Sequence, residues 1–443
     1  MVNWMLYFRL SALMFMEFAV WGAWMPVLAL RLLGPLKMTG KQTGWIYATF
    51  PLACIFAPLA SGYLADKWFN AEWVLFACHA GGAVLLFLIA RQTKFWGMFW
   101  TMLAYSVLYT ATLPLVNKML FGQLPSADTW VFLWAPVSWA LIGYFLTGFR
   151  QWFKLPGDGP DSLYLAAILS IVMAVVCLWQ EPLKPVSAGN PMIDALAMLK
   201  NGNFLIFILV QLAVSGMMQF YFLGTGQFLQ DRGISGKNVS AVMALAQAVQ
   251  AAATILLLGL LLGEWFLVLG VKTGNVGHYL YVGNAGYRWT FVLGALCWSV
   301  LYAVYVMSKR TKSIVLIQAF HGLAYVFFMI GGQKFVGYLA PQAIGASAQS
   351  LIFIATNGIG VFLGTQLAGL AMEKNSVGGK FQWSKIWMVP LGITFAGALV
   401  FALVFKVPSP AEFQKTLPSP QAEAILVEGH SSPLPVCTTR VMN

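Results

Sequence analysis

The chain has 443 residues, of which 60% are hydrophobic and only 9% are charged. Soluble globular domains carry about 25% charged residues, so this composition excludes a soluble protein and indicates an integral membrane protein. The formal charge of +12 is spread over short loops, which favours contact with anionic lipid headgroups over nucleic acid. The five cysteines show no spacing typical of disulfides or metal sites.

Long apolar runs follow one another along most of the chain. Each is about 18 residues or longer, the length that a helix needs to cross the hydrocarbon core of a bilayer. A membrane β-barrel would show shorter segments of alternating polarity instead. We therefore predict an all-α membrane protein with twelve transmembrane helices. They fall within residues 8–30, 43–65, 72–90, 95–120, 130–150, 161–179, 203–230, 237–262, 289–307, 313–338, 343–372 and 384–405.

A polar stretch, residues 180–202, separates the sixth predicted helix from the seventh. It contains three prolines, several charges and a Gly-Asn pair, which cannot continue a helix and indicate a linker. Six helices on each side predict two bundles, residues 1–179 and 203–406, with a substrate held between them as in many transporters. Residues 263–288 mix apolar and turn sequences and predict an extended helix end or a surface hairpin. The proline-rich residues 407–443 are predicted to be disordered.

Glu17 and Lys118 are ionisable residues inside predicted helices. Glu17 is about halfway along the first one, and a carboxylate at mid-membrane costs about 2.5–3.5 kcal/mol on insertion scales. It should therefore face a polar cavity, face a partner charge or hold a proton, unless it is a satisfied structural acid at a helix contact. Lys118, in the fourth helix, also needs a partner or must lose its proton. We hypothesise a Glu17–Lys118 ion pair that braces the first bundle or serves proton coupling; alternatively, Lys118 extends to the cytoplasmic surface.

The loop after the second predicted helix carries a short charged motif, Gly62-Tyr63-Leu64-Ala65-Asp66-Lys67. A glycine that lets the helix end turn, followed by an acid and a cation, makes a compact charge-and-cap arrangement. The motif resembles the G-x-L-A-D-[KR] signature of the major facilitator superfamily, which implies a gating loop formed by Gly62, Asp66 and Lys67. With six helices in each half, the resemblance implies the fold of that superfamily.

The sequence is also similar to the bacterial nucleoside–proton symporter family. The segments that carry this similarity occur in both halves and in the same order. They are Phe18–Trp24, Ala65–Trp68, Ala71–Val74, Cys78-His79, Leu115–Asn117, Ala346–Gln349 and Thr356–Gly358. The resemblance implies nucleoside transport across the bacterial inner membrane by alternating access. Three positions that are charged in well-known members are neutral here, Val137, Gln250 and Val326, so both a proton symporter and a uniporter stay open.

The resemblance places Gln219 and Gln247 in a substrate pocket, where a family asparagine is replaced by Phe222. A nucleoside offers a flat base and ribose hydroxyls, which aromatic rings and amides can bind. Each amide could instead join two helices, and each aromatic could pack against lipid or core. We predict a substrate site built from nine side chains. They are Asn117, Trp139, Tyr144, Gln219, Gln227, Gln247, Gln250, Tyr325 and Asn357.

Other chemistry finds little support in the sequence. It contains no nucleophile–base motif, phosphate-binding glycine loop or metal-ligand cluster, so we predict a protein that is not an enzyme and binds no cofactor or metal. His79 and His321 lie within or at the ends of helices and are interpreted as hydrogen-bonded packing residues. A carrier of a sugar-like metabolite and a receptor without transport are the alternative functions. We expect a monomer surrounded by lipid.

The distribution of Lys and Arg in the loops disagrees with the cytoplasmic amino terminus that the Asp66-Lys67 motif implies. A cytoplasmic amino terminus would place eleven of the 26 Lys and Arg residues at the cytoplasmic face, although cations usually concentrate there. We follow the motif, which places Asp66-Lys67 in the cytoplasm.

Overall fold

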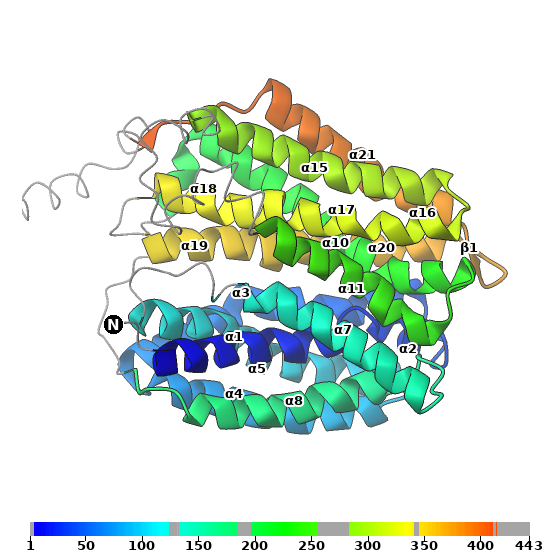
Figure 1. Ribbon diagram of the computed structural model, residues 1–443. Coiled ribbons are helices and arrows are strands. Elements are labelled where there is room, and N and C mark those ends of the chain that lie inside the picture. The colour runs from blue at the N-terminus through cyan, green and yellow to red at the C-terminus, as the bar shows by residue number, and fades with distance from the viewer. Residues whose placement is uncertain are drawn as a thin grey trace, which may run out of the picture.

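The computed structural model describes residues 4–123, 131, 133–183, 196–254, 283–340, 345–410 and 413. The helices form two groups, the first half of the chain below and the second half above in Figure 1. The first group consists of α1 (Trp4–Trp24), α2 (Leu28–Leu33), α3 (Gly40–Lys67), α4 (Ala71–Arg91), α5 (Phe95–Gln123), α7 (Trp134–Trp152) and α8 (Asp161–Leu178).

The second group is more often interrupted. It consists of η1 (Ala197–Lys200), α10 (Gly202–Asp231), α11 (Gly236–Ala253), α15 (Gly283–Met307), α16 (Thr311–Leu316), α17 (Gln318–Ala324), η3 (Tyr325–Ile330), α18 (Gly331–Leu339), α19 (Gly345–Phe353), η5 (Ile354–Gly360), α20 (Val361–Lys374), the hairpin of β1 (Ser376–Val377) and β2 (Lys380–Phe381), and α21 (Trp383–Leu403). Two spans, α16 to α18 and α19 to α20, contain a π-helical turn, η3 and η5. Such turns occur often at functional sites.

The predicted twelve-helix membrane fold is confirmed. Ten described helical stretches are long and apolar enough to cross a membrane. The two remaining predicted spans are also helical and correspond to α7 and α11, which pack against each other between the two halves. Their polar residues are buried in this contact, among them Arg150 on α7 and Ser240 and Gln247 on α11. These helices can therefore be less apolar than the others.

Two predictions about connecting segments are wrong where the structure describes them. Residues 283–286 begin α15 instead of forming a turn, because the cost of glycine in a helix is only about 1 kcal/mol and the long apolar helix that follows offsets it. Phe413 lies in the tail predicted to be disordered, yet its ring is buried 5.5 Å from the ring of Phe204. Residues 184–195, 255–282 and 414–443 lie outside the described residues.

The two halves meet at the end of the molecule opposite to the amino terminus, on the right of Figure 1. We call this the distal end; it comprises the start of α3, α2, the ends of α7, α10 and α20, and the start of α11. There α7 packs against α11, α3 against α20, and α2 against α10. Gly157 has a φ of +97° and lies against the backbone of Gly236, so a side chain at this position is excluded both by its conformation and by its space. Gln151 donates to the side-chain oxygen of Asn238 at 2.9 Å.

A fully buried arginine joins these elements at the distal end. Arg150 donates from Nε to Asp161 Oδ2 at 2.5 Å and from Nη1 to Ser240 Oγ, in the other half, at 3.0 Å. Removing one partner of a buried ion pair costs about 3–5 kcal/mol. The Asp161 side chain keeps 12% of its surface exposed, so we expect the lower end of this range.

We therefore predict that Arg150→Met lowers the thermal unfolding midpoint of the purified protein, with a destabilisation of roughly 3 kcal/mol. Asp161→Asn should restore part of this loss in the double variant, because it removes the unpaired charge. Arg91→Met serves as the control, since Arg91 ends α4 and is exposed. Equal stability of Arg150→Met and the wild type, or strictly additive losses in the double variant, would show that the pair does not stabilise the distal end.

Candidate functional site

A narrow pocket lies between the halves, where α1 and α7 meet α10 and α11. Trp139 and Gln247, both predicted to bind substrate, line it together with Tyr221 and Phe222. The rings are in contact, with the Phe222 centroid 6.0 Å from that of Trp139 and 5.5 Å from that of Tyr221. The space left between these side chains holds about one water molecule, so a nucleoside can enter only when they separate.

Further aromatic rings support the pocket from both halves. Trp21 on α1 meets Trp139 edge to face at 5.4 Å and stacks on Phe50 of α3 at 4.6 Å. In the second half, His321 on α17 stacks on Tyr221 with ring centroids 3.8 Å apart and planes 12° from parallel. Such pairs are rigid and fix the orientation of the rings that line the pocket.

Several buried polar atoms around the pocket lack a hydrogen-bond partner among the described residues. They include Trp139 Nε1, Gln219 Oε1, the Tyr221 hydroxyl and His321 Nε2. Trp298 donates to His321 Nδ1 at 3.2 Å, so the hydrogen of the neutral imidazole lies on the unpaired Nε2. A buried polar atom without a partner costs about 1–3 kcal/mol. A polar ligand in this region would satisfy both donors and acceptors.

Four other predicted substrate residues lie in the second half of the chain and are not among the side chains that line the pocket. Gln219 is buried on α10, two residues before Tyr221, and Gln250 is buried on α11, one turn beyond Gln247. Tyr325 is half-buried at the start of η3. Asn357, in η5, donates to its neighbour Thr356 at 3.1 Å. For these four residues, a role in binding stays a prediction.

Three predicted substrate residues lie away from the pocket. Tyr144 is 44% exposed on an apolar face of α7 beside Leu141 and Phe145, because it lies on a different side of the helix from Trp139. Gln227 donates to Asp231 at 2.9 Å near the end of α10. Asn117 is exposed on α5, a helix that does not line the pocket. The structure therefore does not bring these three residues into the pocket, and their role in binding stays a prediction.

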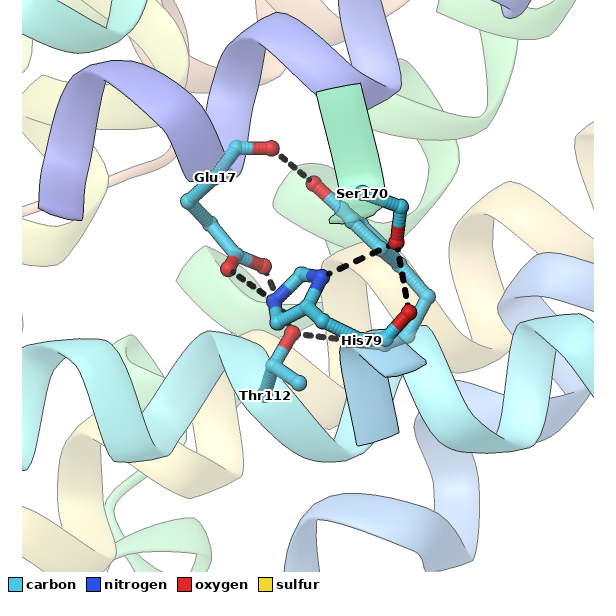
Figure 2. A network of polar contacts seen from close by, with 5 residues as sticks. Glu17, His79, Thr112 and Ser170 are labelled. Carbon is cyan, nitrogen blue, oxygen red and sulfur yellow. Dashed lines mark hydrogen bonds and ion pairs between the residues drawn. The ribbon is translucent and has the colours of Figure 1, made fainter. Parts of the chain in front are cut away.

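The hypothesis of a Glu17–Lys118 ion pair is also wrong. Glu17 instead contacts His79 Nε2 at 2.9 Å and accepts from Thr112 at 2.6 Å (Figure 2). Lys118 lies six residues beyond Thr112 on α5, about 9 Å along the helix axis, and donates to the carbonyl of Ala65 at 3.0 Å. The alternative, that Lys118 extends to the cytoplasmic surface, stays a prediction. The side chains of Gly62, Asp66 and Lys67, the predicted gating loop, lie outside the described part of the chain.

Two helical bundles around an interfacial pocket define a secondary transporter of the major facilitator type. A family model described as nucleoside H+ symporter matches residues 5–410. The chain belongs to the nucleoside H+ symporter family, which confirms the resemblance seen in its sequence.

Individual relatives agree with this assignment. The chain is 27% identical to the nucleoside permease NupG of Escherichia coli strain K12, over 90% of this chain and 95% of that protein. It is 25% identical to the xanthosine permease of the same strain over 90% of this chain and 95% of that protein. A crystal structure of NupG has a TM-score of 0.75 at 25% identity, covering 92% of this chain and all of that one. A bacterial homologue of the lysosomal transporter Spinster, at 14% identity and a TM-score of 0.66, shares the fold.

Proposed function

We propose that this protein carries nucleosides together with protons across the bacterial inner membrane by alternating access. In this proposal the nucleoside base stacks among Trp139, Tyr221 and Phe222, and Gln219 and Gln247 bind its polar edges. One observation carries the proposal: hydrogen-bonding atoms without partners are buried among aromatic rings between the two halves. The protein acts as a monomer in the lipid bilayer and catalyses no reaction.

The chemistry of these side chains suits a nucleoside. The indole N–H of Trp139 can only donate, Gln219 Oε1 can only accept, and Gln247 can do both. A base carries donors and acceptors on its edge, and the ribose adds hydroxyls of both kinds. The faces of the aromatic rings offer stacking, which is worth about 1–3 kcal/mol per base.

Alternating access follows from the contacts at the distal end. The halves touch there through α7 and α11 and through α3 and α20, and the pocket lies beside the first of these contacts. Separation of the distal end would open the pocket to that side of the membrane. Rocking of one bundle against the other around a fixed site is the usual motion of such carriers.

Counterflow tests this proposal without a proton gradient. Proteoliposomes loaded with unlabelled uridine should accumulate external labelled uridine, and external adenosine or xanthosine should compete whereas glucose should not. Competition by glucose but not by nucleosides would favour the carrier of a sugar-like metabolite. Nucleoside binding without counterflow would favour a receptor. Either result would overturn the proposed function.

A further inference from the structure

Among the residues that the structure describes, Glu17 is the one acidic side chain buried near the middle of a membrane span. It is 0% exposed and lies close to the centre of the Trp4–Leu33 span. The other described acids lie at helix ends or in loops, such as Glu72 in the first turn of α4 and Asp161 in the first turn of α8. A carboxylate in such a place is by default a candidate for a functional site.

Side chains from three other helices gather around Glu17 of α1, as Figure 2 shows. His79 of α4 contacts one carboxylate oxygen at 2.9 Å, and Thr112 of α5 donates to the other at 2.6 Å. Ser170 of α8 lies behind the imidazole, with Oγ 3.4 Å from His79 Nδ1 and 2.9 Å from the His79 carbonyl, to which it donates. All four side chains are buried.

These contacts require a proton between Glu17 and His79. Ser170 directs its only hydroxyl hydrogen to the His79 carbonyl, so its oxygen can accept a hydrogen bond from Nδ1–H but cannot donate to Nδ1. When Nδ1–H donates to Ser170, the 2.9 Å contact at Nε2 needs a second hydrogen, carried either by the imidazolium or by the carboxyl group. In that state the pair holds one proton more than a carboxylate beside a neutral imidazole, whose single hydrogen would lie on Nε2.

Neither Glu17 nor His79 has a Lys or Arg among its described hydrogen-bond and ion-pair partners. The other titratable groups on which Glu17 acts electrostatically are Tyr105 and Tyr109 on α5, Cys78 on α4 and Cys177 on α8. The part of α7 that packs against this region of α1 contributes the indole of Trp139. Loss of the shared proton would thus leave a net negative charge buried among neutral groups, which is unfavourable unless the helices rearrange.

We propose that Glu17 and His79 form a shared proton-binding site through which this carrier couples proton movement to nucleoside movement. The inference rests on the proposed function and assigns the proton to these two residues. When the pair is protonated it is electrically neutral, and the four helices pack around it. When the proton leaves, the remaining charge favours a state in which water reaches Glu17.

A short path connects this site to the substrate pocket. The Tyr109 hydroxyl donates to the backbone carbonyl of Glu17 at 2.7 Å, and the Tyr109 ring lies 6.1 Å from that of Trp21, one helical turn beyond Glu17. Trp21 and the adjacent Gly22 both contact Trp139, which lines the pocket. A shift of α1 at Glu17 would therefore move the ring that is proposed to stack on the base.

Glu17→Gln separates coupling from transport, because it preserves shape and hydrogen bonding but cannot exchange a proton. We expect counterflow of uridine to continue in proteoliposomes, whereas accumulation driven by a pH gradient falls about tenfold or more, within the range of typical coupling free energies. Uridine-driven proton entry, followed with a trapped pH-sensitive dye, should disappear. His79→Gln should weaken the same two signals and shift the pH dependence of uptake.

Glu72→Gln is the matched control, because Glu72 is also buried but accepts a hydrogen bond from the Leu183 backbone, away from this network. It should keep gradient-driven accumulation. Full coupling in both Glu17→Gln and His79→Gln would overturn the assignment, and so would a wild-type protein that shows counterflow but no proton entry. Absence of counterflow in the wild type would instead overturn the proposed function.

Discussion

Replacing Gly369 with leucine should slow transport by roughly 10- to 100-fold without abolishing nucleoside binding. Gly369 on α20 faces Gly40 and Gly44 on α3 at the distal end. A Cβ atom at this position would lie 2.8 Å from the Gly40 carbonyl oxygen and 3.1 Å from the Gly44 Cα. Overpacking of this kind costs about 1–3 kcal/mol. This cost destabilises only the state of the carrier in which the distal end is closed, and not the state in which it is open.

Counterflow rates and nucleoside binding, measured on the same preparation, separate this effect from damage to the site. Gly392→Leu on α21 is the matched control, because nothing lies within 4 Å of a Cβ atom placed there and the residue is exposed. It should transport at the wild-type rate. Wild-type counterflow by Gly369→Leu would mean that close contact between α3 and α20 is not needed during the cycle.

The sequence predicts the helices well because each membrane span must be long and apolar. It predicts poorly which buried side chains contact each other. Glu17 stands out in an apolar run, but both Lys118 and His79 are plausible partners for it, and only the packing of α1 against α4 and α5 decides between them. A cation such as Lys118 is the partner that charge alone favours for Glu17. The ion pair does not form because α1 contacts α5 at Thr112, nearly two helical turns before Lys118.

Helical geometry alone excludes some of the predicted combinations of site residues. Trp139 and Tyr144 are five residues apart and so point about 140° from each other, which excludes a common pocket on one helix face. Gln219 and Gln227 are separated by about 12 Å along α10, too far for one small ligand. Tyr221 is different: nearly every residue in this part of α10 is buried, so no apolar stripe marks the face that meets the pocket.

Trp139 should be the largest single contributor to nucleoside affinity. Its ring contacts Trp21 in one half and Phe222 in the other, and its indole N–H has no partner among the described residues. Trp139→Ala removes both a stacking surface and a donor. Stacking alone is worth about 1–3 kcal/mol per base, so we expect the Kd for uridine to rise by roughly 5- to 150-fold. Gln247→Leu removes one neutral hydrogen bond and should raise the Kd for uridine by about tenfold at most.

Titration calorimetry on the purified protein measures both effects, with Trp152→Ala as the control because Trp152 ends the same helix and is 83% exposed. Dihydrouridine separates stacking from the loss of the donor, since it keeps the ribose but its base is no longer flat. Trp139→Ala should therefore weaken dihydrouridine binding less than uridine binding. Equal losses for the two ligands would assign Trp139 to the ribose, and unchanged affinity for both would remove it from the substrate site, leaving its ring as a contact between the halves.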